Sequence, residues 1–339
     1  MTTTDAKPPL VLEQLIHGFM VTQCLYVAAT LGIADLLKDG PRHFEDLAQA
    51  TNTHAPSLYH VLRLLTTVDL LTEAQTHSFA LTPLGTYLQT DVAGSMRHLV
   101  RFYGQQTTWR VWGALLHSVQ TGEPSYGQVW GVSNREYRAQ HPEAAALFDQ
   151  YMTEWAARLA PTVEAAYDFS TTSTLVDVGG GQGHILATIL QAHPRLRGVL
   201  LDLPPVVAGA PPLLEAAGVA DRCEVVGGDA FTAVPAGYEI YLLSRVLLPY
   251  DDDHALTILT RCQQAMQPRG KLLLVEPVIL TEQAPNLLGM EADVHMLVIT
   301  GGRERTEAEY RALLQACGFE LTQLTAVLTP FYLIEAVRL

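Results

Sequence analysis

Cysteine and basic residues are scarce in this chain of 339 residues. The 4 cysteines (Cys24, Cys223, Cys262 and Cys317) lie far apart, with no C-x-x-C pair and no histidine at zinc-ligand spacing. This pattern excludes a disulfide framework and does not support a metal site, so we expect reduced core thiols. The 21 Lys and Arg face 35 Asp and Glu, a net charge of -14, which argues against nucleic acid as a partner.

Membrane and export signals are also lacking in the sequence. No apolar run approaches the length of a membrane span, and the opening residues MTTTDAK lack the apolar region of a signal peptide. We therefore expect a cytoplasmic protein without membrane contact. With 48% hydrophobic and 17% charged residues, the chain can build large cores, and its length favours two domains.

The most informative stretch that is present runs from Thr174 to His184, TLVDVGGGQGH. An apolar strand-like run ends in an acid and a glycine turn, and a helix-like segment follows at 185–192. Such glycines lack the Cβ atoms that would block a ligand, and the helix start offers free N–H groups. His184 stands where a dinucleotide fingerprint needs its third glycine, and a P-loop's Gly-Lys-Ser/Thr is missing. The pattern acid-x-G-x-G-x-G is typical of class I S-adenosylmethionine-dependent methyltransferases. A dehydrogenase or a plain tight turn remains an alternative from this motif alone.

The first half of the chain predicts mainly helices. Residues 10–31 carry apolar residues at helical spacing with few charges, which predicts a helix buried on more than one side, as in many dimer interfaces. Predicted helices at 33–38, 44–50 and 55–71, with β-type pieces around Glu73 and at 79–82, outline a winged helix. Residues 57–65 offer a single Arg, so a packing or dimerisation module is favoured over DNA binding, and a metabolite-sensing regulator is the alternative.

The second half alternates strands and helices. Residues 95–165 are helical and rich in aromatics, some of which could line a cavity for a flat apolar substrate. Beyond residue 170, predicted strands separated by helices indicate an α/β fold with a parallel doubly wound sheet. The predicted strands are 175–178, 198–203, 223–226, 239–243, 271–275, 321–327 and 331–337, the last two forming an antiparallel hairpin at the sheet edge.

Two acids follow consecutive predicted strands. Asp202 lies 19 residues after Gly183 (202 − 183 = 19), where a carboxylate can accept hydrogen bonds from both ribose hydroxyls of a nucleoside. Asp229 follows the third strand, where an acid can bond an adenine amino group while its apolar neighbour covers the ring. For Asp229 alone, a turn-capping loop residue is the alternative. Two acids at the ends of consecutive strands after a glycine turn indicate a nucleoside site more specifically than Asp229 alone does.

Taken in order, six segments resemble the small-molecule O-methyltransferases related to caffeate, flavonoid, hydroxyindole and bacterial polyketide methyltransferases. The segments are LVDVGGGQG at 175–183, GVLLDLP at 198–204, GDAF at 228–231, YLLSRVL at 241–247, VEPV at 275–278 and GGRERT at 301–306. The resemblance implies a Rossmann-like methyltransferase sheet and a homodimer. It assigns residues 1–165 to a helical, winged-helix-like dimerisation and substrate-lid domain, and residues 166–339 to an S-adenosylmethionine-binding domain.

By position, the resemblance also assigns site residues. The cofactor residues are Gly179 and Gly181 for the amino acid part, Asp202 for the ribose, Leu203, Asp229, Ala230 and Phe231 for the adenine, and Ser244 and Arg245, which close that side. The acceptor pocket is assigned to Phe148, Met152, Trp155, His295 and Met296. For Phe148 and Met152, ordinary helix core at i, i+4 spacing is the alternative.

The chain departs from this family at the catalytic base. Where the family reads V-L-H-D-W, this chain reads VLLPY at 246–250, so Leu248 replaces the histidine that removes the acceptor's proton. The flanking Glu276 and Glu304 are kept. Such a base contributes roughly 10²- to 10⁴-fold, so its loss does not by itself end methyl transfer. His295 is the candidate replacement base, and a neutral imidazole bonded to a backbone carbonyl or Asp293 is the alternative. An ion-paired surface loop is the alternative for Glu304.

These observations predict S-adenosylmethionine-dependent methyl transfer to a hydroxyl of a flat small molecule in secondary metabolism. Another base could act, or the acceptor could arrive as an anion. The chain could also keep the cofactor for a rearrangement, cyclisation or hydroxylation without methylating. Three acids at 251–253 could suggest a magnesium site, but they precede a helix, whose first turn favours carboxylates.

Overall fold

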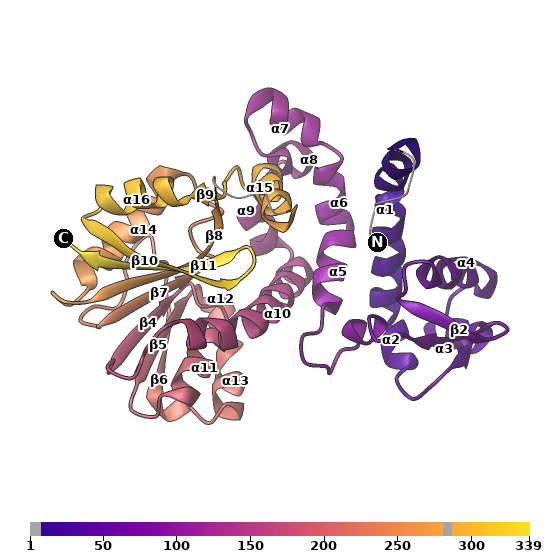
Figure 1. Ribbon diagram of the computed structural model, residues 1–339, viewed down its shortest axis with the longest axis horizontal. Helices are drawn as coiled ribbons and strands as arrows, with labels where there is room; N and C mark the ends of the chain where they lie inside the picture. Colours follow the sequence, from indigo (N-terminus) through magenta and orange to yellow (C-terminus); the bar gives the residue numbers. More distant parts are fainter. Residues whose placement is uncertain (1–7, 281–286) are drawn as a thin grey trace. The chain divides into compact units, whose positions relative to one another are not determined.

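The computed structural model describes residues 8–280 and 287–339, which form two compact units that meet in the sequence between Arg110 and Val111 (Figure 1). The predicted functional division at residue 165 concerns the roles of the segments and stays a prediction. In the first unit the elements are α1 (Pro8–Leu31), α2 (Ile33–Leu36), β1 (Arg42–His43), α3 (Phe44–Thr51), α4 (Ala55–Thr66), β2 (Leu71–Gln75), β3 (Ser78–Leu81), a 3-10 helix (Gly85–Leu88), α5 (Arg97–Gly104) and the start of α6 (Gln106–Trp112).

The first unit has the predicted winged-helix outline. Its antiparallel sheet has the order β1-β3-β2, and Leu47, Leu62 and Phe79 lie in a core between the short helices and this sheet. The helix predicted at 55–71 is too long, since α4 ends at Thr66. Asp69 has φ of 58°, which an α-helix cannot accommodate, and the chain turns there into β2.

Helix α1 is more exposed than its sequence suggested. Leu15, Ile16 and Phe19 are 74%, 60% and 50% exposed, so the expected burial on more than one side is wrong for the single chain. The expectation that no run reaches membrane-spanning length is also wrong. By length and composition alone, the 24 residues of α1 suffice to span a bilayer. A single such helix near the N-terminus is weak evidence for a membrane span.

The second unit is a sheet covered by helices. Its helices are α7 (Leu115–Thr121), α8 (Ser125–Trp130), α9 (Asn134–Gln140), α10 (Pro142–Ala166), α11 (His184–Ala192), α12 (Pro204–Val207), α13 (Ala210–Ala216), α14 (Asp252–Ala265), α15 (Leu287–Ile299) and α16 (Glu307–Ala316), with a 3-10 helix at Ala220–Arg222. Its strands are β4 (Thr174–Val178), β5 (Arg197–Asp202), β6 (Cys223–Gly227), β7 (Ile240–Ser244), β8 (Lys271–Ile279), β9 (Arg305–Thr306), β10 (Phe319–Leu328) and β11 (Phe331–Arg338).

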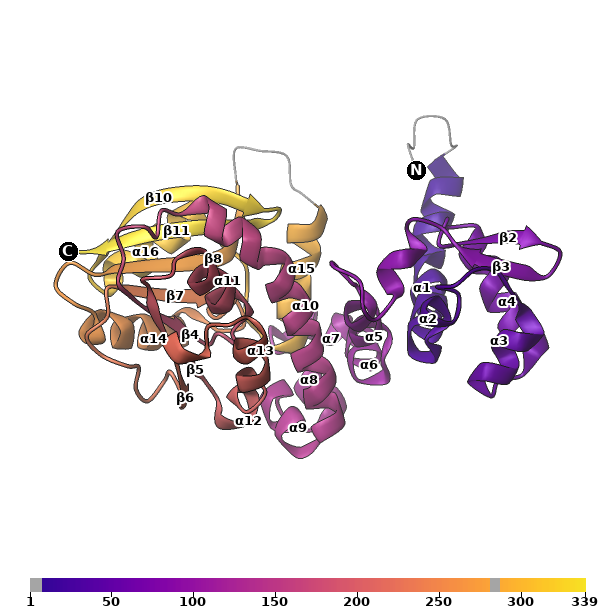
Figure 2. The same ribbon diagram turned by 90° about the horizontal axis from the view of Figure 1, so that it is seen from below.

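The main sheet confirms the predicted doubly wound topology. Its order is β10-β11-β8-β7-β4-β5-β6, which Figure 2 shows from one edge to the other. Strands β4 to β8 pair in parallel, and β10 pairs with β11 as the predicted antiparallel hairpin. Helices α10, α11 and α13 pack on one face around Leu186, and α14 and α16 pack on the other around Tyr241. Because the parallel strands end at the same edge, the loops after them meet there.

Candidate active site

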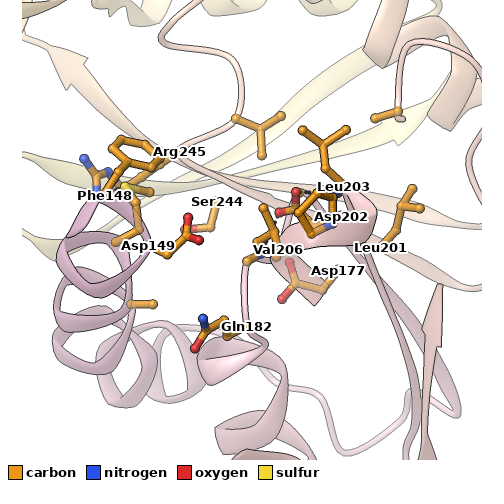
Figure 3. A pocket seen from close by; sticks show the side chains of 18 of the residues that line it. Phe148, Asp149, Asp177, Gln182, Leu201, Asp202, Leu203, Val206, Ser244 and Arg245 are labelled. Atoms are coloured by element: carbon orange, nitrogen blue, oxygen red, sulfur yellow. Dashed lines mark hydrogen bonds between the residues drawn. The ribbon is translucent and has the colours of Figure 1, made fainter. Parts of the chain in front are cut away.

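A cavity of about 820 Å³ opens where the loops after β4, β5, β6 and β7 converge beside α9 and α10 (Figure 3). Most of the predicted site residues line it. They are Gly179, Gly181, Asp202, Leu203, Asp229, Ala230, Phe231, Ser244 and Arg245 from the predicted cofactor set, and Phe148 and Met152 from the predicted acceptor set. Trp155, Glu276, His295, Met296 and Glu304 are not among the lining residues.

The glycine turn after β4 lines the cavity. Gly179 and Gly181 have φ of 71° and 63°, in the left-handed region that favours glycine. A Cβ at position 179 would lie 2.8 Å from Val246 Cγ2, so the turn also packs too closely for a side chain. The Gly181 N–H donates to Asp202 Oδ2 over 2.8 Å, and this bond holds the turn against the end of β5.

Four aspartates line the cavity: Asp149, Asp177, Asp202 and Asp229. Asp177 is 1% exposed, and within the described residues neither of its carboxylate oxygens has a hydrogen-bond partner. Burial, and then repulsion from Asp202, raises the pKa of Asp177 to about 7. Burial also raises the pKa of Asp202, although the Leu203 and Gly181 N–H groups oppose this shift. A cationic ligand would relieve this concentration of acids.

Asp229 is already engaged by a basic residue. Its Oδ2 lies 2.7 Å from Arg135 Nη2 of α9, and its Oδ1 accepts from the Phe231 N–H over 3.0 Å. A carboxylate has about four acceptor positions, so a further donor can still bind. The Phe231 ring meets Tyr250 edge to face at 5.1 Å between centroids.

Sequence reasoning missed several lining residues, among them Arg135, Arg138, Asp149 and Tyr250. Tyr250 could have been found from the sequence, because it occupies the position of the tryptophan in the family's V-L-H-D-W motif. The others lie on α9 and α10, and helical periodicity does not tell which helix covers a sheet edge. Arg138 lies with its guanidinium carbon 3.9 Å from the centre of the Phe148 ring.

Arg245 lies with the predicted acceptor residues. Its Nη1 donates to Met152 Sδ over 3.4 Å, and its guanidinium lies 5.1 Å from the centre of Trp155 and 5.7 Å from that of Phe331. Figure 3 shows Arg245 beside Phe148, with Asp202 and Leu203 at the other end of the view. The resemblance had assigned it to the cofactor side.

His295 is buried at 5% exposure outside the cavity lining. The indole N–H of Trp112 donates to its Nδ1 over 3.1 Å, and the two rings stack with centroids 6.0 Å apart. Asp293, the partner considered for His295, instead accepts from the Glu304 N–H over 2.9 Å. Burial, and then the Arg245 charge, lowers the pKa of His295 to about 4, so the imidazole is neutral near pH 7.

The position of the family histidine is closed by apolar packing, since Leu248 is 6% exposed. Glu276 Oε1 accepts from the N–H groups of Val246 and Leu247, each over 2.8 Å. Burial raises the pKa of Glu276 to about 7, and burial followed by repulsion from Glu276 raises that of Glu304 to about 8. In the described residues, the Oε2 atoms of both glutamates lack hydrogen-bond partners.

Two alternatives weighed for nearby charged residues are now decided. Glu304 is 3% exposed, so the ion-paired surface loop is wrong, and Arg303 and Arg305 both pair with Asp252. Asp251 caps α14 by accepting the His254 N–H over 2.9 Å, which confirms the helix-start interpretation of these acids. Within residues 8–280 and 287–339, no group of three His, Cys, Asp or Glu side chains is placed to hold a metal ion.

Known proteins match this chain over nearly its whole length. The model of the O-methyltransferase domain matches residues 112–320, and that of the O-methyltransferase dimerisation domain matches residues 13–91. The phenazine O-methyltransferase PhzM of Lysobacter antibioticus is 41% identical over 96% of this chain and 95% of its own length.

Solved structures agree with this match. The crystal structure of LaPhzM has a TM-score of 0.95 at 40% identity, covering 98% of this chain and 100% of that one. The O-methyltransferase NcsB1 from neocarzinostatin biosynthesis, in complex with S-adenosylmethionine and 2-hydroxy-5-methyl naphthoic acid, has a TM-score of 0.80 at 32% identity, covering 94% and 96%. The chain therefore belongs to the family of S-adenosylmethionine-dependent O-methyltransferases.

Proposed function

We propose that this protein methylates a hydroxyl group of a flat aromatic small molecule of secondary metabolism. The observation that carries the proposal is the single cavity with two chemically different ends. One end is the glycine turn with its aspartates, and the other presents Phe148 and Met152. Relatives named for phenazine and mitomycin methylation support a flat aromatic acceptor.

The donor end suits each part of S-adenosylmethionine. Gly179 and Gly181 allow the amino acid part to approach the backbone, and Asp202 is placed to accept from the ribose hydroxyls. Asp229 accepts from the adenine amino group, with Leu203, Ala230 and Phe231 around the ring and Ser244 at its border. The acidic lining suits the sulfonium charge.

The bound cofactor supplies a methyl group already activated by its positive sulfur. The protein residues then have to align the acceptor oxygen with that methyl group and exclude water. Phe148 and Met152 line the cavity and hold the acceptor ring, whereas the predicted acceptor residues Trp155 and Met296 lie outside its lining. Glu276 acts as a positioning residue, since it binds the backbone of the turn that carries Arg245, and Glu304 lies beside it.

His295 was predicted to be the replacement base, and its geometry does not support that role. An indole N–H can only donate, so Nδ1 of His295 uses its lone pair on Trp112 and the proton of the neutral ring is on Nε2. A neutral ring in this form cannot take up a proton at Nε2, and His295 lies outside the cavity lining, so we do not propose it as the base.

We further propose that the protein works as a cytoplasmic homodimer that pairs through α1. The exposed apolar residues of α1 lie in the segment matched by the dimerisation model. The double variant Leu15→Glu/Ile16→Glu should be monomeric in light scattering, while Leu339→Glu, at an equally exposed leucine, should remain dimeric. A dimer in both variants would place the interface elsewhere.

The test of the proposed function is formation of S-adenosylhomocysteine from S-adenosylmethionine with a panel of phenols. The matched variants are Asp202→Asn and Glu239→Gln, because each wild-type carboxylate accepts two backbone N–H groups and only Asp202 lines the cavity. Asp202→Asn should weaken cofactor binding about 10- to 100-fold, as expected for hydrogen bonds to a charged group. Glu239→Gln should leave it within about twofold. Cofactor binding without methyl transfer to any phenol would point to the non-methylating alternative.

A further inference from the structure

We propose that Arg245 binds the acceptor as an oxyanion, so that the substrate class is acidic phenols and enols that react in their ionised form. This inference rests on the proposed methyl transfer. It makes Arg245 a catalytic residue at the acceptor end of the cavity and gives this chain a substitute for the family histidine that Leu248 replaces.

The backbone around Arg245 fixes where its side chain points. Arg245 has φ of 58°, an uncommon conformation for a long side chain, and its N–H donates to the Val275 carbonyl over 2.9 Å. The next two N–H groups, of Val246 and Leu247, both donate to Glu276 Oε1. Strain of this kind persists where the surroundings impose it, and it often marks a functional position.

Three aromatic rings lie near the guanidinium. The rings of Tyr151, Trp155 and Phe331, here called the aromatic cluster, have centroids 5.8, 5.1 and 5.7 Å from its central carbon. Its Nε is buried and, in the part of the chain that the structure describes, lacks a hydrogen-bond partner. An unsatisfied buried donor on a cation is costly, so the site is completed by an anion that enters the cavity.

Titratable groups from four elements interact with Arg245 or lie beside it, and burial keeps the two acids among them partly protonated near pH 7. Glu276 of β8 and Glu304 before β9 have raised pKa values, and His295 of α15 is neutral near pH 7. Arg158 of α10 is a second cation, which also lies over Trp155, at 4.0 Å. Phe148 and Met152 border the same end of the cavity and offer apolar contact to the rest of an aromatic anion.

The chemistry balances without a protein base. The acceptor loses its proton to water before the transfer step, and Arg245 favours the resulting oxyanion. An oxygen lone pair then forms the new C–O bond, the C–S bond breaks, and its electron pair neutralises the sulfonium. Both the sulfonium and the Arg245 guanidinium would carry positive charge when the cofactor is bound, and each would favour the ionised acceptor.

The first experiment measures ionisation of a bound acceptor without turnover. The absorbance of 4-nitrophenol and of 1-hydroxy-2-naphthoate is titrated with pH on the dimer saturated with S-adenosylhomocysteine. The wild type should lower the pKa of the bound phenol by about one unit or more. Arg245→Met, which keeps an apolar chain against the aromatic cluster, should abolish the shift. Arg158→Met is the matched control, since it removes the other cation over Trp155 and should keep the shift.

The second experiment uses methylation rates for phenols of graded acidity. In the wild type, kcat/KM should rise with pH up to the pKa of each acceptor, so that the inflection moves with the acceptor. Arg245→Met should lower kcat/KM about 10²-fold or more while S-adenosylhomocysteine still binds normally, and Arg245→Lys should recover part of it. An inflection at one pH for all acceptors, an unshifted pKa in the wild type, or no binding of either probe would overturn the role of Arg245. If no phenol is methylated by the wild type, the proposed function itself fails.

Discussion

The indole N–H of Trp112 donates to Nδ1 of His295 over 3.1 Å, and this one hydrogen bond determines which nitrogen of the imidazole carries the proton. Tryptophan has no acceptor on its ring, so the alternative tautomer would leave two N–H groups facing each other. The proton of His295 is therefore on Nε2. His295, which the sequence predicted to be a base, is held in a tautomer that cannot accept a proton at Nε2.

Replacing Trp112 by phenylalanine should release this constraint. Trp112→Phe keeps an aromatic ring beside His295 and removes the N–H donor. We expect nitrogen NMR shifts of His295 to change from a single Nε2–H form to a mixture of tautomers, and kcat to fall about tenfold with KM for the cofactor unchanged. His295→Ala should lower kcat by a similar factor. A wild-type spectrum showing the proton on Nδ1 would contradict the assignment.

Restoring the family histidine should help weak acids only. Leu248→His places an imidazole beside the turn that Glu276 binds, and a base accelerates only acceptors that arrive protonated. Phenols with a pKa near 10 should gain roughly 10²-fold in kcat/KM, within the range of general base catalysis, and acidic phenols should change less than threefold. Equal gains for both classes would show that the wild type does not use ionised acceptors.

Cofactor affinity should depend on pH through Asp177. Its pKa of about 7 in the empty site must fall when a sulfonium binds nearby, so binding releases a proton below pH 7. The Kd for S-adenosylmethionine, divided by that for S-adenosylhomocysteine, should therefore drop about tenfold between about pH 6 and pH 8. Both ligands carry the same amino group, so the effect of its titration on the two Kd values cancels in the ratio. Calorimetry measures both constants.

Two variants check this assignment to Asp177. Asp177→Asn should abolish the pH dependence of the ratio. Asp229→Asn should weaken binding but keep the pH dependence, because hydrogen bonds from Arg135 and Phe231 oppose the effect of burial and leave the pKa of Asp229 below its usual value. A ratio that is flat across this range in the wild type would rule out a shifted Asp177.

Stability should fall as the pH rises through the titration of Glu304. Its folded pKa of about 8 lies above the ordinary glutamate value of 4.5, so the folded state retains a proton that the unfolded chain has lost. Unfolding releases that proton between these values, and the free energy of unfolding decreases across the window. Glu304→Gln cannot ionise and should raise Tm at about pH 8.5 by about 2 °C or more, with little change near pH 5.

The control for this prediction has the opposite sign. Glu309 accepts hydrogen bonds from Thr306 at the start of α16, and these lower its pKa. Its stabilisation is present above the unfolded pKa and is lost in acid, so Glu309→Gln should lower Tm at about pH 8.5. Thermal melts at both pH values compare the two variants. The same Tm change for Glu304→Gln at both values would refute the buried-acid interpretation.

Much of the fold was predictable because strands leave a strong local pattern. The apolar run before Gly179 and the hairpin strands β10 and β11 were located within two residues at most ends. The exposure of α1 was not predictable, since a surface covered by a second chain has the same apolar pattern as a core helix. The end of α4 was missed because the turn depends on the left-handed backbone of Asp69.

The candidate site was predictable where it follows strand ends and not where it depends on side-chain direction. Asp202 is the last residue of β5 and Asp229 follows β6, and parallel strands bring such residues together. Arg135 reaches Asp229 from a helix more than ninety positions earlier, a contact that no local pattern announces. Arg245 points toward the aromatic cluster because of its backbone conformation, which its residue type does not favour.

The aromatic cluster has one more consequence, because Phe331 comes from the C-terminal hairpin and Tyr151 and Trp155 come from α10. These segments are distinct from the loops after β4, β5 and β6, which carry the glycine turn and the cavity residues Asp202 and Asp229. Exchanging the hairpin and part of α10 between relatives can therefore retune which compound is methylated while the methyl donor stays the same. Such a division would allow one scaffold to serve many biosynthetic routes through changes confined to the surroundings of Arg245.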